Sequence, residues 1–204
     1  MLISSVYLCV MNYLAHAYLS FGYPELLVGN MISDFIKGKR KFDYSKGIQN
    51  GIMLHRAIDE FTDMHEATKE AKKYFKEDYG LYAGAFIDVV YDHFLAKDDN
   101  EFPGDTLQQF SLNTYHQLQA FEPVFPERFQ RMFYYMKTQD WLFHYQFNQG
   151  VKNSFHGLTR RAKYMNDYET AFTIFETHYE SLQDCYNNFF PSVKKFASGK
   201  IDRS

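Results

Sequence analysis

The stretch 51–63 constrains this chain most, because it places an imidazole and a carboxylate on the face that a helix should bury. His55 and Asp59 are four residues apart, so on a helix they share one side with Ile48 and Ile52. This spacing of i, i+4, i+7 and i+11 is typical of the buried stripe of an amphipathic helix. We therefore expect a helix here that turns two ionisable groups toward the interior.

A second stretch, 88–93, repeats this pattern. Asp88 and Asp92 continue an apolar stripe through Leu81 and Ala85. Burying a carboxylate costs on the order of several kcal/mol unless the group is paired or bound to a cation. Two helices with such stripes indicate one shared polar centre, and a metal ion is the simplest way to offset the cost. A buried hydrogen-bond network is the rival explanation.

Two earlier segments add polar groups to apolar faces. His16 lies four residues after Asn12, and Asp34 falls on a stripe with Leu27 and Asn30. Taken alone, His16 is a core histidine and Asp34 is equally well a carboxylate at a helix end. Histidine and carboxylate without cysteine favour Mn²⁺, Mg²⁺ or Fe²⁺ over structural zinc, as one or two ions. The joint pattern gives these candidate metal ligands: His16, Asp34, His55, Asp59, Asp88 and Asp92.

Other polar residues near these stripes have competing explanations. Asp63 with Glu66 resembles a capping box, so it either starts the next helix or supports the site. His93 adjoins Asp92 and is a ligand, a proton donor or a core histidine. The basic run 37–41 is either a solvated loop or a contact for a phosphate or an acidic partner. The candidate contact residues are Lys37, Lys39, Arg40 and Arg160, and the neighbouring Arg161 is either a further phosphate contact or a surface arginine.

The chain of 204 residues, with 21 phenylalanines and 17 tyrosines, is long enough for one buried core. No strand-period segment stands out, so we expect a single all-α domain, a bundle of about seven to nine helices over residues 11–196. Residues 1–10 are expected to form an N-terminal extension and 197–204 a flexible tail. Ser45 is expected to cap the helix that carries His55, and the last long helix is expected to end at Pro191.

Composition excludes several classes of function. The formal net charge of −3 gives no overall field for nucleic acid, and no apolar run is long enough to cross a bilayer. Cys9 and Cys185 are far apart and indicate reduced thiols rather than a disulfide framework. We therefore expect a cytoplasmic protein without nucleic-acid or membrane partners. No Gly-rich phosphate loop, nucleophile elbow or kinase motif is present.

Four segments resemble the bacterial acyl carrier protein phosphodiesterase (ACP hydrolase) family, and 140–142 is a weaker fifth match. The resemblance runs from Met11 to about Pro191. It implies an all-helical fold like that of the HD-domain phosphohydrolases, although the adjacent pair Asp92-His93 reverses the usual His-Asp order. It also implies that Mn²⁺ is used to release 4′-phosphopantetheine from the serine of holo-acyl carrier protein. The four segments are Asn12–His16, Gly29–Asp34, Gly51–Asp59 with Thr62-Asp63, and Asp88–Leu95.

The candidate residues then take expected roles around one or two ions that activate water for attack on phosphorus. Arg56 is expected to stabilise charge on the phosphoryl oxygens, and His93 to protonate the leaving serine oxygen. Asp63 is expected to orient a ligand histidine, and the basic run to contact the acidic carrier protein. Two alternatives remain: the same chemistry on a nucleotide or another small phosphodiester, and a non-catalytic helical binding protein.

Overall fold

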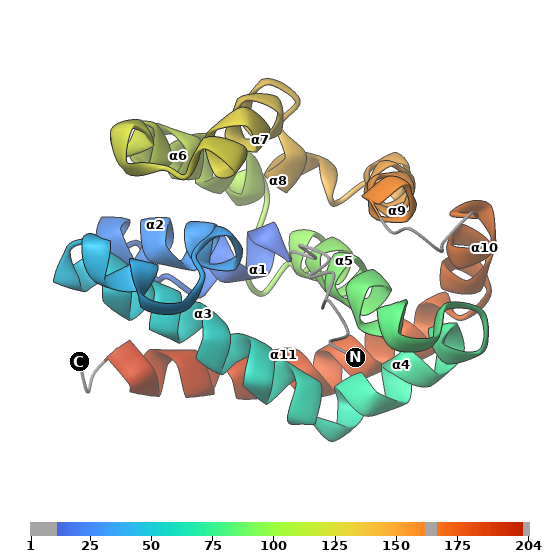
Figure 1. The fold of residues 1–204 in the computed structure, drawn as a ribbon. Helices are drawn as coiled ribbons and strands as arrows, with labels where there is room; N and C mark the ends of the chain where they lie inside the picture. Colours follow the sequence, from blue (N-terminus) through green and yellow to red (C-terminus); the bar gives the residue numbers. More distant parts are fainter. Residues whose placement is uncertain (1–11, 162–166, 202–204) are drawn as a thin grey trace, which may run out of the picture.

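The computed structural model describes residues 12–161 and 167–201, and every regular element within them is a helix (Figure 1). The expected single all-α domain is confirmed. Four 3-10 helices, η1 to η4, connect the α-helices, and all α-helices except α1 and α8 are nine residues or longer. In order they are α1 (Tyr13–Tyr18), α2 (Pro24–Ile32), α3 (Lys46–Met64), α4 (Glu66–Tyr79), α5 (Ala83–Ala96), α6 (Thr106–Gln119), α7 (Glu127–Thr138), α8 (Trp141–His144), α9 (Asn148–Arg161), α10 (Glu169–Thr177) and α11 (Tyr179–Ile201).

Helices α2 and α3 lie against each other more extensively than any other described pair (Figure 1). Two glycines make this close approach possible. A Cβ atom on Gly29 would lie 2.1 Å from the carbonyl oxygen of Ile48, and one on Gly51 would lie 2.3 Å from that of Leu26. Because the backbones touch here, α2 and the turn that follows it are fixed relative to the middle of α3.

Helix α3 begins where the sequence predicts. It ends after Asp63, whereas the capping-box interpretation requires a new helix to start at that residue. The Ser45 hydroxyl accepts from the backbone N–H of Ile48 at 3.4 Å. The interpretation of Asp63 as a helix start is wrong, because α3 continues to Met64. Instead, Nδ1 of His65 accepts from the N–H of Ala67 and caps α4. The long α3 therefore carries its buried stripe through the domain without a break.

Helix α5 lies in the middle of the domain and is buried on almost every side (Figure 1). Aromatic side chains from four helices surround it. Phe75 of α4 stacks on Phe86 of α5 at a centroid distance of 5.5 Å, and Phe155 of α9 meets both rings edge-on. This packing explains the high phenylalanine content and fixes the direction in which the polar side chains of α5 point.

The C-terminal region differs from the prediction of one helix ending at Pro191. Asp167 accepts from the N–H groups of Glu169 and Thr170 and caps the separate α10. Helix α11 then runs through the exposed Pro191 to Ile201, because buried residues on both sides of the proline hold it in place. Residues 197–201 of the expected flexible tail are thus helical. Residues 202–204 and the expected extension 1–10 lie outside the described residues.

None of the helices in the described ranges combines the length and the apolar character that a membrane span requires.

Candidate metal centre

Two buried imidazoles from different helices lie face to face. His16 of α1 and His55 of α3 stack with ring centroids 4.0 Å apart and planes inclined by 21°. Both side chains are almost fully buried. Two stacked imidazoles repel each other when both are positively charged, so nearby negative charge or a metal ion would stabilise the pair.

Carboxylates supply that negative charge from one side. Asp59, one turn after His55, places Oδ1 3.1 Å from Nε2 of His16 and Oδ2 3.2 Å from Nε2 of His55. Asp34, in η1 (Ser33–Phe35) directly after α2, places Oδ1 3.3 Å from the same nitrogen of His55. The side chain of Asp59 is 48% exposed and that of Asp34 28% exposed, so the cluster opens to solvent on its carboxylate side.

The ring hydrogen of His16 has a fixed position. Nδ1 of His16 lies 2.7 Å from Oδ1 of Asn30, an oxygen that only accepts. The orientation of this amide is itself determined, because its Nδ2 donates to the carbonyl of His16 at 2.9 Å and to the hydroxyl of Ser20 at 3.1 Å. His16 must therefore donate through Nδ1, and neutral His16 presents a bare lone pair on Nε2 toward Asp59.

Burial and the contacts within the cluster shift the pKa values of His16, His55 and Asp59. Burial, followed by the charge of His55, lowers the pKa of His16 below its ordinary value. Burial opposes ionisation of Asp59, but hydrogen bonds to the two histidines hold its pKa well below the usual range. Despite burial, hydrogen bonds to Asp34 and Asp59 raise the pKa of His55 to about 10. With the Nδ1 hydrogen of His16 directed at Asn30, the lone pair on Nε2 of a neutral His16 faces the carboxylate of Asp59, and a cation between them would satisfy both groups.

The donor set fits a divalent cation. Donor atoms of His16, His55 and Asp59 lie within 4.8 Å of one another. Two donors about 2.1 Å from one ion and at right angles lie about 3.0 Å apart, close to the observed 3.1 and 3.2 Å. Nδ1 of His55 is buried and has no hydrogen-bond partner among the described residues. These three residues, with Asp34 beside them, form the candidate metal centre.

Replacing Asn30 with leucine should reduce metal affinity and activity by about 10- to 100-fold, the usual effect of losing the partner that orients a ligand histidine. The physical reason is that His16 loses the acceptor for its Nδ1–H and can rotate or change tautomer. Titration with Mn²⁺ measures the change. The variant Asn50→Leu, on the neighbouring helix, serves as the control, and equal affinities in all three proteins would refute the role of Asn30.

The structure does not bring Asp92 into this cluster. Both of its oxygens accept backbone N–H groups at 2.9 Å, from Leu14 and from Ala15 at the start of α1. Burial raises the pKa of Asp92, and these two hydrogen bonds oppose that effect. Asp92 therefore caps the short helix that carries His16, so that it positions a candidate ligand although its own oxygens are used by the backbone.

Asp88 of α5 lies close enough to Asp59 and Asp63 of α3 for their charges to act on it. Burial, and then the charge of Asp59, raises the pKa of Asp88 well above its ordinary value. It is not one of the three grouped donors. Asp63 is exposed and forms an ion pair with Lys72 of α4 at 2.6 Å, and among the described residues it has no hydrogen bond to a candidate ligand histidine. Neither residue bonds directly to the two histidines in the described structure.

His93 is a hydrogen-bonded core histidine, the third of the explanations that its sequence position allowed. Its Nδ1–H donates to the carbonyl of Tyr145 at 2.7 Å, and Nε2 accepts from the hydroxyl of Tyr179 at 3.1 Å. Burial lowers the pKa of His93 to about 4, so the ring is neutral. Because both nitrogens are occupied on the side of α8 and α11, the expected proton donor does not reach the cluster.

The basic candidates occupy two different places. Arg56 donates from Nη2 to the carbonyl of Ile36 at 3.1 Å and so ties the segment after Asp34 to α3. Lys37, Lys39 and Arg40 are exposed at or within η2 (Gly38–Asp43). Arg160 is exposed on α9 and lines a separate cavity. The side chain of Arg161 lies outside what the structure describes.

Comparison with known proteins shows similarity to one protein family over nearly the whole chain. A family model described as acyl carrier protein phosphodiesterase matches residues 11–193. Proteins named acyl carrier protein phosphodiesterase from Yersinia pestis and Yersinia enterocolitica are 33% and 32% identical to this chain, covering 93% of it and 99% of their own length. One from Escherichia coli is 28% identical with the same coverage. No solved structure matches, so the expected likeness to HD domains stays a prediction.

Proposed function

The chain belongs to the acyl carrier protein phosphodiesterase family, and we propose that it hydrolyses the phosphodiester between 4′-phosphopantetheine and the serine of holo-acyl carrier protein. The observation that carries this proposal is the grouping of His16, His55 and Asp59 with their nitrogen and oxygen donors converging. Converging imidazole and carboxylate donors are typical metal ligands in enzymes that hydrolyse phosphoesters with the help of a metal ion.

Mn²⁺ is the ion we propose, with Mg²⁺ or Fe²⁺ as the alternatives, because the donors are imidazole and carboxylate without thiolate. His16 and His55 would hold it through Nε2 and Asp59 through a carboxylate oxygen, with Asp34 in reach as a further ligand. Such an ion lowers the pKa of bound water and neutralises charge on the phosphoryl oxygens.

The protein's own residues hold the reacting groups in place. Asn30 keeps the lone pair of Nε2 of His16 directed toward Asp59. Arg56 secures the segment between Asp34 and the basic residues by bonding the carbonyl of Ile36. The exposed edge of Asp59 and Asp34 is the side from which a phosphodiester can approach, since the imidazoles are buried behind it.

Exposed cations next to this edge suit an acidic carrier protein. The double variant Lys39→Glu with Arg40→Glu should raise KM for holo-acyl carrier protein by roughly tenfold, and kcat should stay unchanged. Steady-state kinetics at low and high salt measure this, and the difference should shrink as salt rises. The control Lys76→Glu with Lys195→Glu changes the net charge equally on α4 and α11. An equal rise in KM in both double variants would exclude a specific contact.

The proposed activity is tested by incubating the purified protein with holo-acyl carrier protein and Mn²⁺ and weighing the carrier by mass spectrometry. We expect loss of the prosthetic group, and no loss after treatment with a chelator. An unchanged carrier together with cleavage of a small phosphodiester would favour the alternative substrate class. No metal uptake and an unchanged melting temperature after chelation would favour the non-catalytic binding protein.

A further inference from the structure

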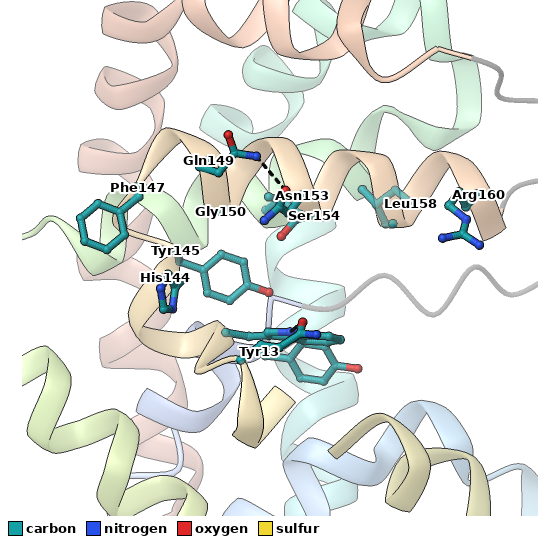
Figure 2. Close-up of a pocket in the computed structure, with 14 residues that line it drawn as sticks. Tyr13, His144, Tyr145, Phe147, Gln149, Gly150, Asn153, Ser154, Leu158 and Arg160 are labelled. Carbon is teal, nitrogen blue, oxygen red and sulfur yellow. Dashed lines mark hydrogen bonds between the residues drawn. The ribbon is translucent and has the colours of Figure 1, made fainter. Parts of the chain in front are cut away.

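A cavity of about 930 Å³ opens between α1, α5, α8 and α9, and none of the candidate metal ligands lines it (Figure 2). Tyr13, Trp141 and Tyr145 contribute aromatic surface. On the α9 side, Ser154 has a small side chain and Gly157 has none, so these two residues leave space in the cavity. The volume lies within the range of cavities that bind small organic ligands and cofactors.

The cavity shares α1 with the metal centre. Tyr13, in its wall, precedes His16 by three residues on α1, so both project from the same short helix. Val89 of α5 also lines it and lies between Asp88 and the capping residue Asp92. A molecule whose phosphate reached the cluster would therefore find this cavity along α1, which carries His16, and along α5, which caps α1 through Asp92.

The polar groups of the cavity are mostly neutral. Three side-chain amides line it, those of Gln139, Gln149 and Asn153, and no carboxylate is among its described lining residues. Among the described lining residues, Arg160 is the one with a permanent charge, and it is exposed. Aromatic walls with amide groups suit an uncharged chain that contains amides. A nucleotide, with several phosphate charges, would require more cations.

A strained residue sets the aromatic wall. Asp140 adopts the left-handed conformation, with φ 45° and ψ 58°, and its carboxylate accepts from the Ser111 hydroxyl and the N–H of Phe143. The next residue, Trp141, donates its indole N–H to Gln139 at 2.9 Å, and its ring lies 6.3 Å from that of Tyr13. Non-glycine residues in this conformation cluster at ligand sites, where the strain presents a side chain.

Resting on the proposed function, we propose that this cavity binds the pantetheine arm of the substrate. The arm is an uncharged, flexible chain with two amides and a branched apolar segment, which matches the amides and aromatic walls described above. Its phosphate end would lie toward α1 and the metal centre, and its thiol end deeper along α9. Arm binding then distinguishes the holo-carrier from other phosphodiesters.

The single tryptophan of the chain, Trp141, makes the test direct, because its fluorescence reports on the cavity wall. Pantetheine and adenosine 3′,5′-bisphosphate, which resemble the two ends of coenzyme A, are titrated separately. We expect pantetheine to change the emission with saturation and the bisphosphate to have no effect. The variant Ser154→Phe fills the cavity and should weaken pantetheine binding by at least about tenfold. The control Ser181→Phe, exposed on α11, should bind as the wild type does.

Binding and hydrolysis separate this inference from the proposed function. Asp59→Asn should retain pantetheine binding, because Asp59 does not line the cavity. Saturable pantetheine binding in a protein that leaves holo-acyl carrier protein intact would overturn the activity and keep the cavity assignment. No emission change with pantetheine, a response to the bisphosphate alone, or a Ser154→Phe variant that binds normally would overturn the cavity assignment.

Discussion

Replacing Asp59 with asparagine will lower kcat on holo-acyl carrier protein by more than about 100-fold, since losing only an outer partner of a ligand already costs about 10- to 100-fold. Asp59 contacts both histidines, with its oxygens 3.1 Å from Nε2 of His16 and 3.2 Å from Nε2 of His55. Its negative charge therefore acts on both imidazoles. The amide keeps the size of the side chain but removes the charge that a divalent ion requires. Because the side chain is half-exposed, stability should change by less than about 1 kcal/mol.

Single-turnover kinetics and thermal denaturation together measure this prediction. Glu60→Gln is the matched control, because Glu60 is the next residue of α3 and is exposed to solvent. It should retain wild-type activity. An Asp59→Asn enzyme with full Mn²⁺-dependent activity would refute the site, whereas a variant that unfolds would be replaced by Asp59→Glu, which keeps the charge and should recover part of the activity.

Replacing Asp92 with alanine will destabilise the protein by about 2 to 6 kcal/mol. Two buried backbone N–H groups at the start of α1 lose the carboxylate oxygens that accept from them, and each unsatisfied donor costs about 1 to 3 kcal/mol. Urea denaturation measures the change in the free energy of unfolding. Asp92→Asn keeps one acceptor oxygen and should lose about half as much.

The exposed Asp99, in the loop that follows α5, provides the control, and Asp99→Ala should leave stability unchanged. The comparison also decides between two roles for Asp92. A helix cap predicts lower stability even when no metal is present. Unchanged stability of the metal-free protein combined with lost metal uptake would instead make Asp92 a ligand.

Helical periodicity was sufficient to predict the all-α fold and the approach of His55 to Asp59, because residues four apart on α3 share a face whatever the rest of the chain does. The family resemblance is confirmed by the match over residues 11–193. Periodicity also placed Asp92 on the buried face of α5. It did not identify the partner of that carboxylate, which is the backbone of α1, 78 residues away in sequence.

Long-range partners explain the other differences. His93 bonds Tyr145 and Tyr179, 52 and 86 residues away, and nothing near it in sequence indicates these contacts. The sequence indicates Asn30 only as a stripe residue four positions before Asp34, and it does not indicate the bond of Asn30 to His16. The segment 141–145 has aromatic residues at the helical spacing that is typical of a core, yet part of it lines the cavity, because the left-handed turn at Asp140 redirects the chain. Tertiary packing likewise carries α11 through Pro191.

The most direct test of the metal centre is anomalous X-ray diffraction at the manganese edge from crystals grown with Mn²⁺. We expect a peak about 2 to 2.5 Å from Nε2 of His16, Nε2 of His55 and an oxygen of Asp59. The same crystals of Asp59→Asn should lack it. A wild-type map with no peak at these three residues, or with manganese bound only elsewhere, would contradict the proposed centre.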